Sequence, residues 1–119
     1  MKLGKVVGSV VAVPKHERLT GHKLLIVQQL KPSPDGSLIP FAGSGEFTIA
    51  VDLVGVGVGE FVLYSSGSSA RNASSEDRDS PVDEAIIGII DQTDVNGKEI
   101  LVNRDVNRKE ILVNRKEVL

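Results

Sequence analysis

Five short runs of apolar residues, separated by turns rich in glycine and proline, dominate the pattern of this chain. The apolar residues in each run cluster together and do not recur at the spacing of an amphipathic helix. Valine is abundant in them, and β-branched side chains favour strands. The pattern therefore predicts five strands, at residues 4–13, 22–30, 46–54, 60–66 and 86–91.

Several short strands with glycine and proline turns are typical of a small barrel or sandwich. Five strands fit an OB-like barrel best, and a barrel of this size is filled by side chains and leaves no channel within one subunit. One helical turn is predicted near residues 69–73, and Pro81 followed by two acids is typical of a helix start. The predicted fold is all-β: a small five-stranded OB-like β-barrel with one short helix.

The stretch between the second and third strands, residues 31–45, carries three prolines and three glycines and is expected to be a loop. A loop of this length is unusual in a compact domain, so we expect it to have a role of its own or to be mobile. Its composition places it on the outer rim or on a face of an assembly.

The C-terminal tail contains an internal repeat with a period of 11 residues. Residues 95–104 read VNGKEILVNR and residues 106–115 read VNRKEILVNR, which differ only at Gly97 and Arg108. Two copies of one strand compete for one docking site, so we predict that one copy joins the sheet and the other is loosely held or contacts a neighbour. The predicted organisation is a barrel domain at residues 1–95 and a tail at residues 96–119.

Charge and aromatic content argue against several classes of partner. The chain carries 14 basic and 16 acidic residues, a balance too even for a protein that binds phosphate backbones. Single-strand binders need aromatic platforms, whereas Phe47 and Phe61 lie in strand runs, where core packing is expected. A ligand-binding or single-stranded nucleic-acid-binding OB module remains the alternative function. No apolar run approaches the roughly 20 residues needed to span a bilayer, and the N-terminal one is too short and interrupted for an export signal.

Catalytic and metal chemistry lack the residues they need. The chain has no cysteine and two histidines, His16 and His22, which we interpret as solvated turn residues because no third ligand is close in sequence. The glycines of GVGVG are interpreted as a turn between strands, since Glu60 stands where a dinucleotide fingerprint needs its third glycine. The acids near strand ends, such as Asp52 and Glu84, are expected to be solvated or salt-bridged. We predict no catalytic residues, no metal and no cofactor.

Three segments in fixed order carry a family resemblance. They are KLGKVVGSVVAVPKHERLTGHKLLIVQQL, AVDLVGVGVGEFVLYSSGSSAR and PVDEAIIGIID. Together they closely resemble the EutN/CcmL family of bacterial microcompartment vertex proteins, over residues 1 to about 95. The duplicated tail departs from the family pattern, which leaves the edge contacts open.

The resemblance implies a five-stranded barrel with a small helix that assembles as a cyclic pentamer. Such pentamers occupy the five-fold corners of a polyhedral shell tiled by hexameric shell proteins, in the bacterial cytoplasm. The implied function is structural and not enzymatic, in a carboxysome or a catabolic compartment. The implied partners are four further copies of the chain and the hexameric shell proteins, with no nucleic acid and no membrane.

A ring with five-fold symmetry joins one face of each subunit to a different face of the next. Small polar residues suit the close approach of backbones around its axis. We therefore expect the pore to be lined by Ser66, Gly67, Ser68 and Ser69. We expect charged contacts between subunits at Arg71, Asp83 and Glu60.

Overall fold

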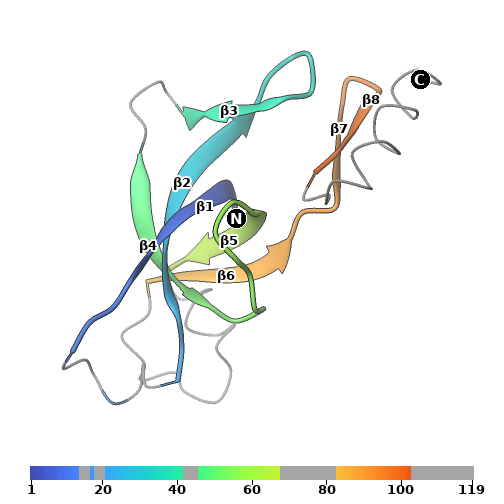
Figure 1. Cartoon of the computed structure of the whole chain (residues 1–119). Coiled ribbons are helices and arrows are strands. Elements are labelled where there is room, and N and C mark those ends of the chain that lie inside the picture. Colours follow the sequence, from blue (N-terminus) through green and yellow to red (C-terminus); the bar gives the residue numbers. More distant parts are fainter. Residues whose placement is uncertain (14–16, 18–20, 42–45, 68–82, 103–119) are drawn as a thin grey trace.

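The computed structural model of the chain describes residues 1–13, 17, 21–41, 46–67 and 83–102. Its regular elements are strands (Figure 1). In chain order they are β1 (Lys2–Val10), β2 (Leu24–Pro32), β3 (Leu38–Pro40), β4 (Phe47–Asp52), β5 (Phe61–Ser66), β6 (Glu84–Ile89), β7 (Gln92–Val95) and β8 (Lys98–Leu101).

Five of these strands form a closed ring of pairings. The sheet runs β1-β5-β6-β4-β2-β3, and an additional pairing of β1 with β2 closes the ring. All neighbours are antiparallel except β4 and β6, which are parallel. The predicted five-stranded all-β fold is confirmed, and each of the five apolar runs overlaps one strand of the ring. The helical turn predicted near residues 69–73 lies outside the described residues. The helix start predicted after Pro81 is wrong at Glu84, which begins β6 because it pairs with Ser66 of β5.

The inside of the ring is filled by aliphatic side chains and one tyrosine. These buried residues are Val6, Leu25, Val27, Ala50, Val56, Val62, Tyr64 and Ile86. They alternate along each strand with residues that point outward, as a filled small barrel requires. Gly4 of β1 faces the same interior, where a Cβ atom would lie 2.8 Å from Tyr64 Cε1. The interior is therefore full at this point, and only glycine fits.

The prediction of a continuous loop over residues 31–45 is partly wrong. Strand β2 continues to Pro32, and β3 returns antiparallel beside it, with Lys31 opposite Ile39. The turn between them is held by Asp35 Oδ1, which accepts hydrogen bonds from the backbone N–H (2.9 Å) and hydroxyl (2.6 Å) of Ser37. The bonds from Ser37, with smaller contributions from Ser33 and Lys98, lower the pKa of Asp35 to about 2. The turn chemistry is thus concentrated in a few residues, and the flanking residues remain free to pair.

A second, separate sheet of two strands follows the barrel. Strands β7 and β8 are joined by Asn96 and Gly97, whose φ angles of 53° and 81° are typical of a type I′ hairpin turn. The hairpin stands beside the β2–β3 hairpin (Figure 1), where a Cβ atom on Gly36 would lie 2.9 Å from Ile100 Cδ1. Ile100 and Lys98 of β8 therefore lie against the turn between β2 and β3.

This hairpin corrects the prediction for the repeat. The first copy supplies the turn and β8, but β8 pairs with β7 and not with a strand of the barrel sheet. The reason is local: the Asn-Gly turn brings the copy back onto the residues just before it. The second copy lies outside the described residues. The predicted boundary between residues 95 and 96 falls at the turn of this hairpin.

Candidate assembly surface

The predicted pore residues begin where β5 ends. Ser66 is exposed and lies opposite Glu84 in the ladder of β5 and β6. Gly67 follows with a φ of 66°, in the region that favours glycine, and its N–H donates to the carbonyl of Asp83 at 2.8 Å. The structure thus brings Ser66, Gly67 and Asp83 together. The other predicted residues of this group, Ser68, Ser69 and Arg71, lie outside the described residues.

Glu84 is a half-buried acid beside this turn. Its Oε1 lies 4.0 Å from Lys2 Nζ, and its Oε2 is buried with no hydrogen-bond partner among the described residues. Burial raises the pKa of Glu84, Lys2 opposes this rise, and Asp83 adds to it. Burial, reinforced by the charge of Glu84, also raises the pKa of Tyr64 to about 12. The charge of Glu84 is therefore costly at this end of the barrel, and Lys2 supplies a counter-charge 4.0 Å away.

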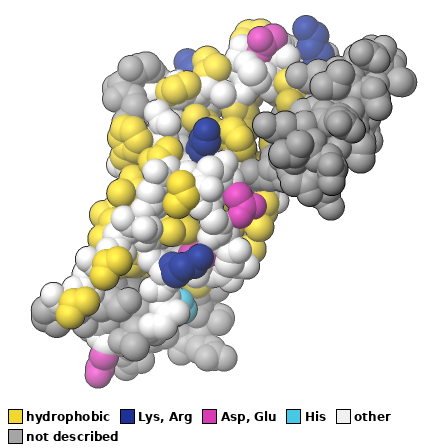
Figure 2. All heavy atoms as spheres, in the orientation of Figure 1, with side chains coloured by type: hydrophobic (Ala, Val, Ile, Leu, Met, Phe, Trp, Pro, Cys, Tyr) yellow, Lys and Arg dark blue, Asp and Glu magenta, His cyan; other side chains and the backbone are white. Residues whose placement is uncertain are grey.

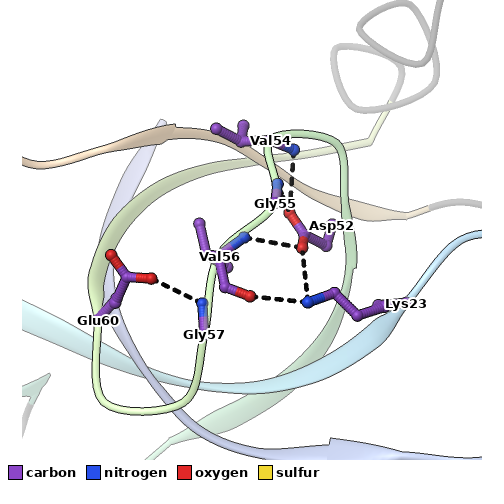
Figure 3. A network of polar contacts seen from close by, with 7 residues as sticks. All are labelled: Lys23, Asp52, Val54, Gly55, Val56, Gly57 and Glu60. Atoms are coloured by element: carbon purple, nitrogen blue, oxygen red, sulfur yellow. Dashed lines mark hydrogen bonds and ion pairs between the residues drawn. The ribbon is translucent and has the colours of Figure 1, made fainter.

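The turn after β4 is organised by one buried carboxylate (Figure 3). Asp52 Oδ1 accepts hydrogen bonds from the N–H groups of Val54 (2.9 Å) and Gly55 (2.8 Å), and Oδ2 accepts one from Val56 (2.9 Å). Lys23 Nζ lies 3.6 Å from Oδ2 and donates to the carbonyl of Val56 at 2.9 Å. One side chain thus satisfies three backbone donors of a turn that has no ladder of its own.

Two opposing effects act on the pKa of Asp52. Burial raises it, whereas the three N–H groups and the Lys23 ammonium lower it, and the net result is a pKa below the ordinary value. Asp52 is therefore ionised at neutral pH, and its charge is stabilised by donors that the fold holds in place. Its role is to fix the backbone, in agreement with the expectation of a salt-bridged acid.

Glu60 closes the other end of the same turn. Its Oε1 accepts a hydrogen bond from the N–H of Gly57 at 2.7 Å (Figure 3), and its backbone carbonyl accepts one from Val6 of β1 at 2.9 Å. The N–H of Gly59 donates to the carbonyl of Val6 at 2.7 Å. Backbone hydrogen bonds therefore hold the glycine-rich turn in place against β1. The carboxylate of Glu60, predicted to contact a neighbouring subunit, is already engaged within its own chain.

The described polar groups offer no site built for a metal. Among residues 1–13, 17, 21–41, 46–67 and 83–102, no three of His, Cys, Asp or Glu gather closely enough to hold a metal ion. The hydroxyl of Ser65 is buried without a hydrogen-bond partner in the same part of the chain. No helix within these ranges is long and apolar enough to cross a membrane.

Large apolar side chains reach the surface at many points of the face shown in Figure 2. The prediction that Phe47 packs in the core is wrong, because its exposed fraction is 56%, and that of Ile49 on the same side of β4 is 52%. Phe61 is half-buried on the outside of β5, where Lys5 Nζ lies 5.4 Å from its ring centroid. The outside of the barrel thus carries apolar surface that a monomer does not need.

Three comparisons relate the chain to known proteins. The family described as "Ethanolamine utilisation protein EutN/carboxysome" matches residues 1–91. The bacterial microcompartment shell vertex protein GrpN of Rhodospirillum rubrum (strain F11) is 46% identical over 93 residues, which cover 76% of this chain and 93% of the relative. The shell vertex protein EutN of Escherichia coli (strain K12) is 39% identical over 106 residues, which cover 87% of this chain and all of the relative.

A solved structure agrees with these sequences. The pentameric microcompartment shell protein GrpN from Rhodospirillum rubrum superposes with a TM-score of 0.65 at 42% identity. The superposition covers 80% of this chain and 99% of that one. The similarity therefore extends over the barrel and nearly the whole length of the relative.

Proposed function

The chain belongs to the EutN/CcmL family of bacterial microcompartment shell vertex proteins, and on this premise we propose that five copies close into a ring at each corner of a shell. It is a structural shell protein, located in the shell of a microcompartment in the bacterial cytoplasm. The observation that carries the pentamer is the match to a relative whose solved structure is pentameric. Five-fold units supply the curvature that sheets of hexamers lack.

The described surface supports a purely structural role. The carboxylates of Asp52 and Glu60 accept hydrogen bonds from backbone N–H groups of their own chain, three at Asp52 and one, from Gly57, at Glu60. Its apolar groups are exposed on the outside of the barrel, where a second copy can cover them. We infer that the protein is not an enzyme. The near-even charge and the few aromatics support the absence of nucleic acid among its partners.

Hexameric shell proteins are the proposed partners at the rim of the ring. The support is geometric, since a corner piece must meet the flat facets that it joins. The β2–β3 hairpin and the β7–β8 hairpin both project from the closed ring of strands (Figure 1), which suits contacts outside the pentamer. Cargo and compartment type are properties of the neighbouring proteins and not of this barrel.

The mass of the protein in native solution tests the pentamer. Purified protein should have a mass of about 64 kDa, five times the chain mass of 12.7 kDa. Native mass spectrometry or light scattering measures this directly. A stable monomer that binds single-stranded oligonucleotides would instead support the OB-module alternative, and a ring of another number would overturn the pentamer.

A truncated chain tests the role of the C-terminal tail. We propose that residues 96–119 are a tail and that its second repeat copy is dispensable for the ring. A chain ending at Asp105 keeps β7 and β8 and loses that copy. It should fold and assemble like the full chain, and failure to do either would show that the second copy is structural.

The axial pore is proposed to be lined by Ser66, Gly67, Ser68 and Ser69. The support is the exposed, backbone-paired turn at Ser66 and Gly67, which presents no bulky side chain. Arg71, Asp83 and Glu60 are proposed to lie at the contact between subunits. Ser69→Trp should leave the ring intact and obstruct its axis in a crystal or electron microscopy structure. An unaltered opening in that variant would place the pore elsewhere.

A further inference from the structure

Gly88 is a strand glycine that its own subunit does not require. It lies in β6 opposite Leu63 of β5, and its φ is not among the positive ones. A Cβ atom there would meet nothing closer than Leu63 Cδ1 at 3.8 Å, an ordinary contact, whereas a Cβ atom on Gly4 would collide with the core. Glycine weakens a strand, and within strands it often marks the close approach of another backbone or a ligand. No described residue comes closer to this position than Leu63, so the described part of the subunit gives no reason for a glycine here.

Phe47 and Ile49 present the opposite feature, two large side chains that their own subunit does not bury. Strand β4 pairs with β6 only at Val51 and Asp52, so residues 47–50 have no strand beside them on that side among the described residues. On the other side their ladder partners on β2 are uncharged, since Gln28 lies opposite Phe47 and Ile26 lies opposite Ile49. An apolar edge of this kind is a template for association unless another chain covers it.

These two features lie far apart on one subunit. In the parallel pair of β4 and β6, Val51 is level with Ala85. Phe47 therefore lies four residues before the paired level and Gly88 three residues after it. At about 3.3 Å per residue, this offset is roughly 23 Å along the strands. Phe47 and Gly88 cannot meet within one subunit, but a ring joins two different faces of its subunits.

We propose that Phe47 and Ile49 of each copy pack over Gly88 of the next copy in the ring. The proposal rests on the pentamer proposed above and assigns its two contact faces: a protruding one on β4 and a receiving one at Gly88 and Leu63. The residues paired with Phe47, Ile49 and Gly88 on neighbouring strands are uncharged. The buried core of a subunit interface is likewise depleted of charged residues. We choose a second copy over a different shell protein as the partner because one chain carries both the exposed side chains on β4 and the open position at Gly88.

The test uses steric complementation. Gly88→Phe fills the receiving face, where the subunit itself has room, and should raise the protein concentration of half-assembly at least about 30-fold. Adding Phe47→Ala to Gly88→Phe should recover part of that loss, because the smaller side chain makes room for the new ring. Phe47→Asp alone should also dissociate the ring. Val11→Asp is the matched control, since Val11 is more exposed (88%) and lies outside both faces.

Light scattering across a dilution series gives the assembly state, and circular dichroism with thermal melting shows that each variant is folded. Intact rings for Gly88→Phe or Phe47→Asp, or dissociation by Val11→Asp as well, would overturn the two faces. If Gly88→Phe fails to fold, the comparison of the assembly states of Phe47→Asp and Val11→Asp tests the proposal on its own. A Phe47→Asp variant that keeps its ring but no longer binds hexameric shell proteins would assign β4 to that partner instead. A wild-type chain that is not pentameric contradicts the proposed function itself, and is recognised before any variant is made.

Discussion

Replacing Asp52 with alanine is expected to lower the free energy of unfolding by about 3 kcal/mol. The substitution leaves three backbone N–H groups, those of Val54, Gly55 and Val56, without the carboxylate that accepts them. Of these, Val56 is fully buried, so water cannot replace its lost acceptor without opening the core. The ion pair with Lys23 adds little to this loss, because the lysine side chain is 60% exposed.

Urea denaturation followed by circular dichroism measures this loss. Asp94→Ala is the matched control, because Asp94 makes the same kind of bond, to the N–H of Gly97 at 3.1 Å, in an exposed hairpin turn. The control should cost about 1 kcal/mol or less. Equal losses for the two variants would show that burial at Asp52 does not matter.

The same residue gives the stability a dependence on pH. Because the folded-state pKa of Asp52 lies below its ordinary value of 3.8, its contribution is present at pH values above 3.8. It is lost as the pH falls through the folded-state pKa, where the carboxylate takes up a proton. The difference in unfolding free energy between wild type and Asp52→Ala should therefore be constant near neutral pH and shrink below about pH 4. A difference that grows in acid would contradict the sign of this shift.

Replacing Gly4 with valine is expected to cost about 3 kcal/mol or more and to leave little folded protein. A Cβ atom at this position would lie 2.8 Å from Tyr64 Cε1, closer still to Val27 Cγ1, and 3.1 Å from the carbonyl oxygen of Gln28. The strand cannot move away, because β1 is paired on both sides there, with Gln29 of β2 and Val62 of β5. The clash must therefore be relieved inside a filled core.

Thermal unfolding of alanine substitutions at Gly4 and at Gly8 of the same strand tests the clash with a matched control. A Cβ atom on Gly8 would lie 3.4 Å from Ile26 Cδ1, the far end of a flexible side chain outside the barrel. Gly8→Ala should shift the melting temperature by a few degrees at most, whereas Gly4→Ala should lower it by roughly 10 °C or more. Similar shifts for both would show that the interior has room at Gly4.

The strands and turns of this protein were predictable because their signals are local. Each predicted apolar run overlaps one strand of the ring. The Asn-Gly pair at residues 96–97 is also a local turn signal, although it was not used to predict the hairpin that it forms. The loop prediction for residues 31–45 is too broad, because it rests on the proline and glycine content of the whole segment. Pro32 and Pro40 instead lie at the end of β2 and on the short edge strand β3, where proline is tolerated.

The candidate surface was less predictable. Phe47 was expected in the core because phenylalanine in a strand is usually buried. Ser66, Gly67 and Asp83 are predicted assembly residues on the basis of their size and charge, whereas the exposed edge of β4 was not predicted from the sequence. Its signal was the sequence FTIAVD, in which the small and polar residues Thr48, Ala50 and Asp52 occupy one side and large apolar residues the other.

The sequence by itself determined the all-β class, the approximate positions of the five strands of the ring and the family, because β-branched runs, turn residues and motif order are properties of short segments. It did not predict β3, β7 or β8. Only the tertiary structure decided which side of β4 faces inward. The interior of a five-stranded ring is small and already filled by Val27, Tyr64 and Ile86, so it accepts Ala50. The large side chains of Phe47 and Ile49 must then point outward. Whether an alternating strand turns one face or the other to the core depends on the volume that all the other strands leave, and no single segment contains that information.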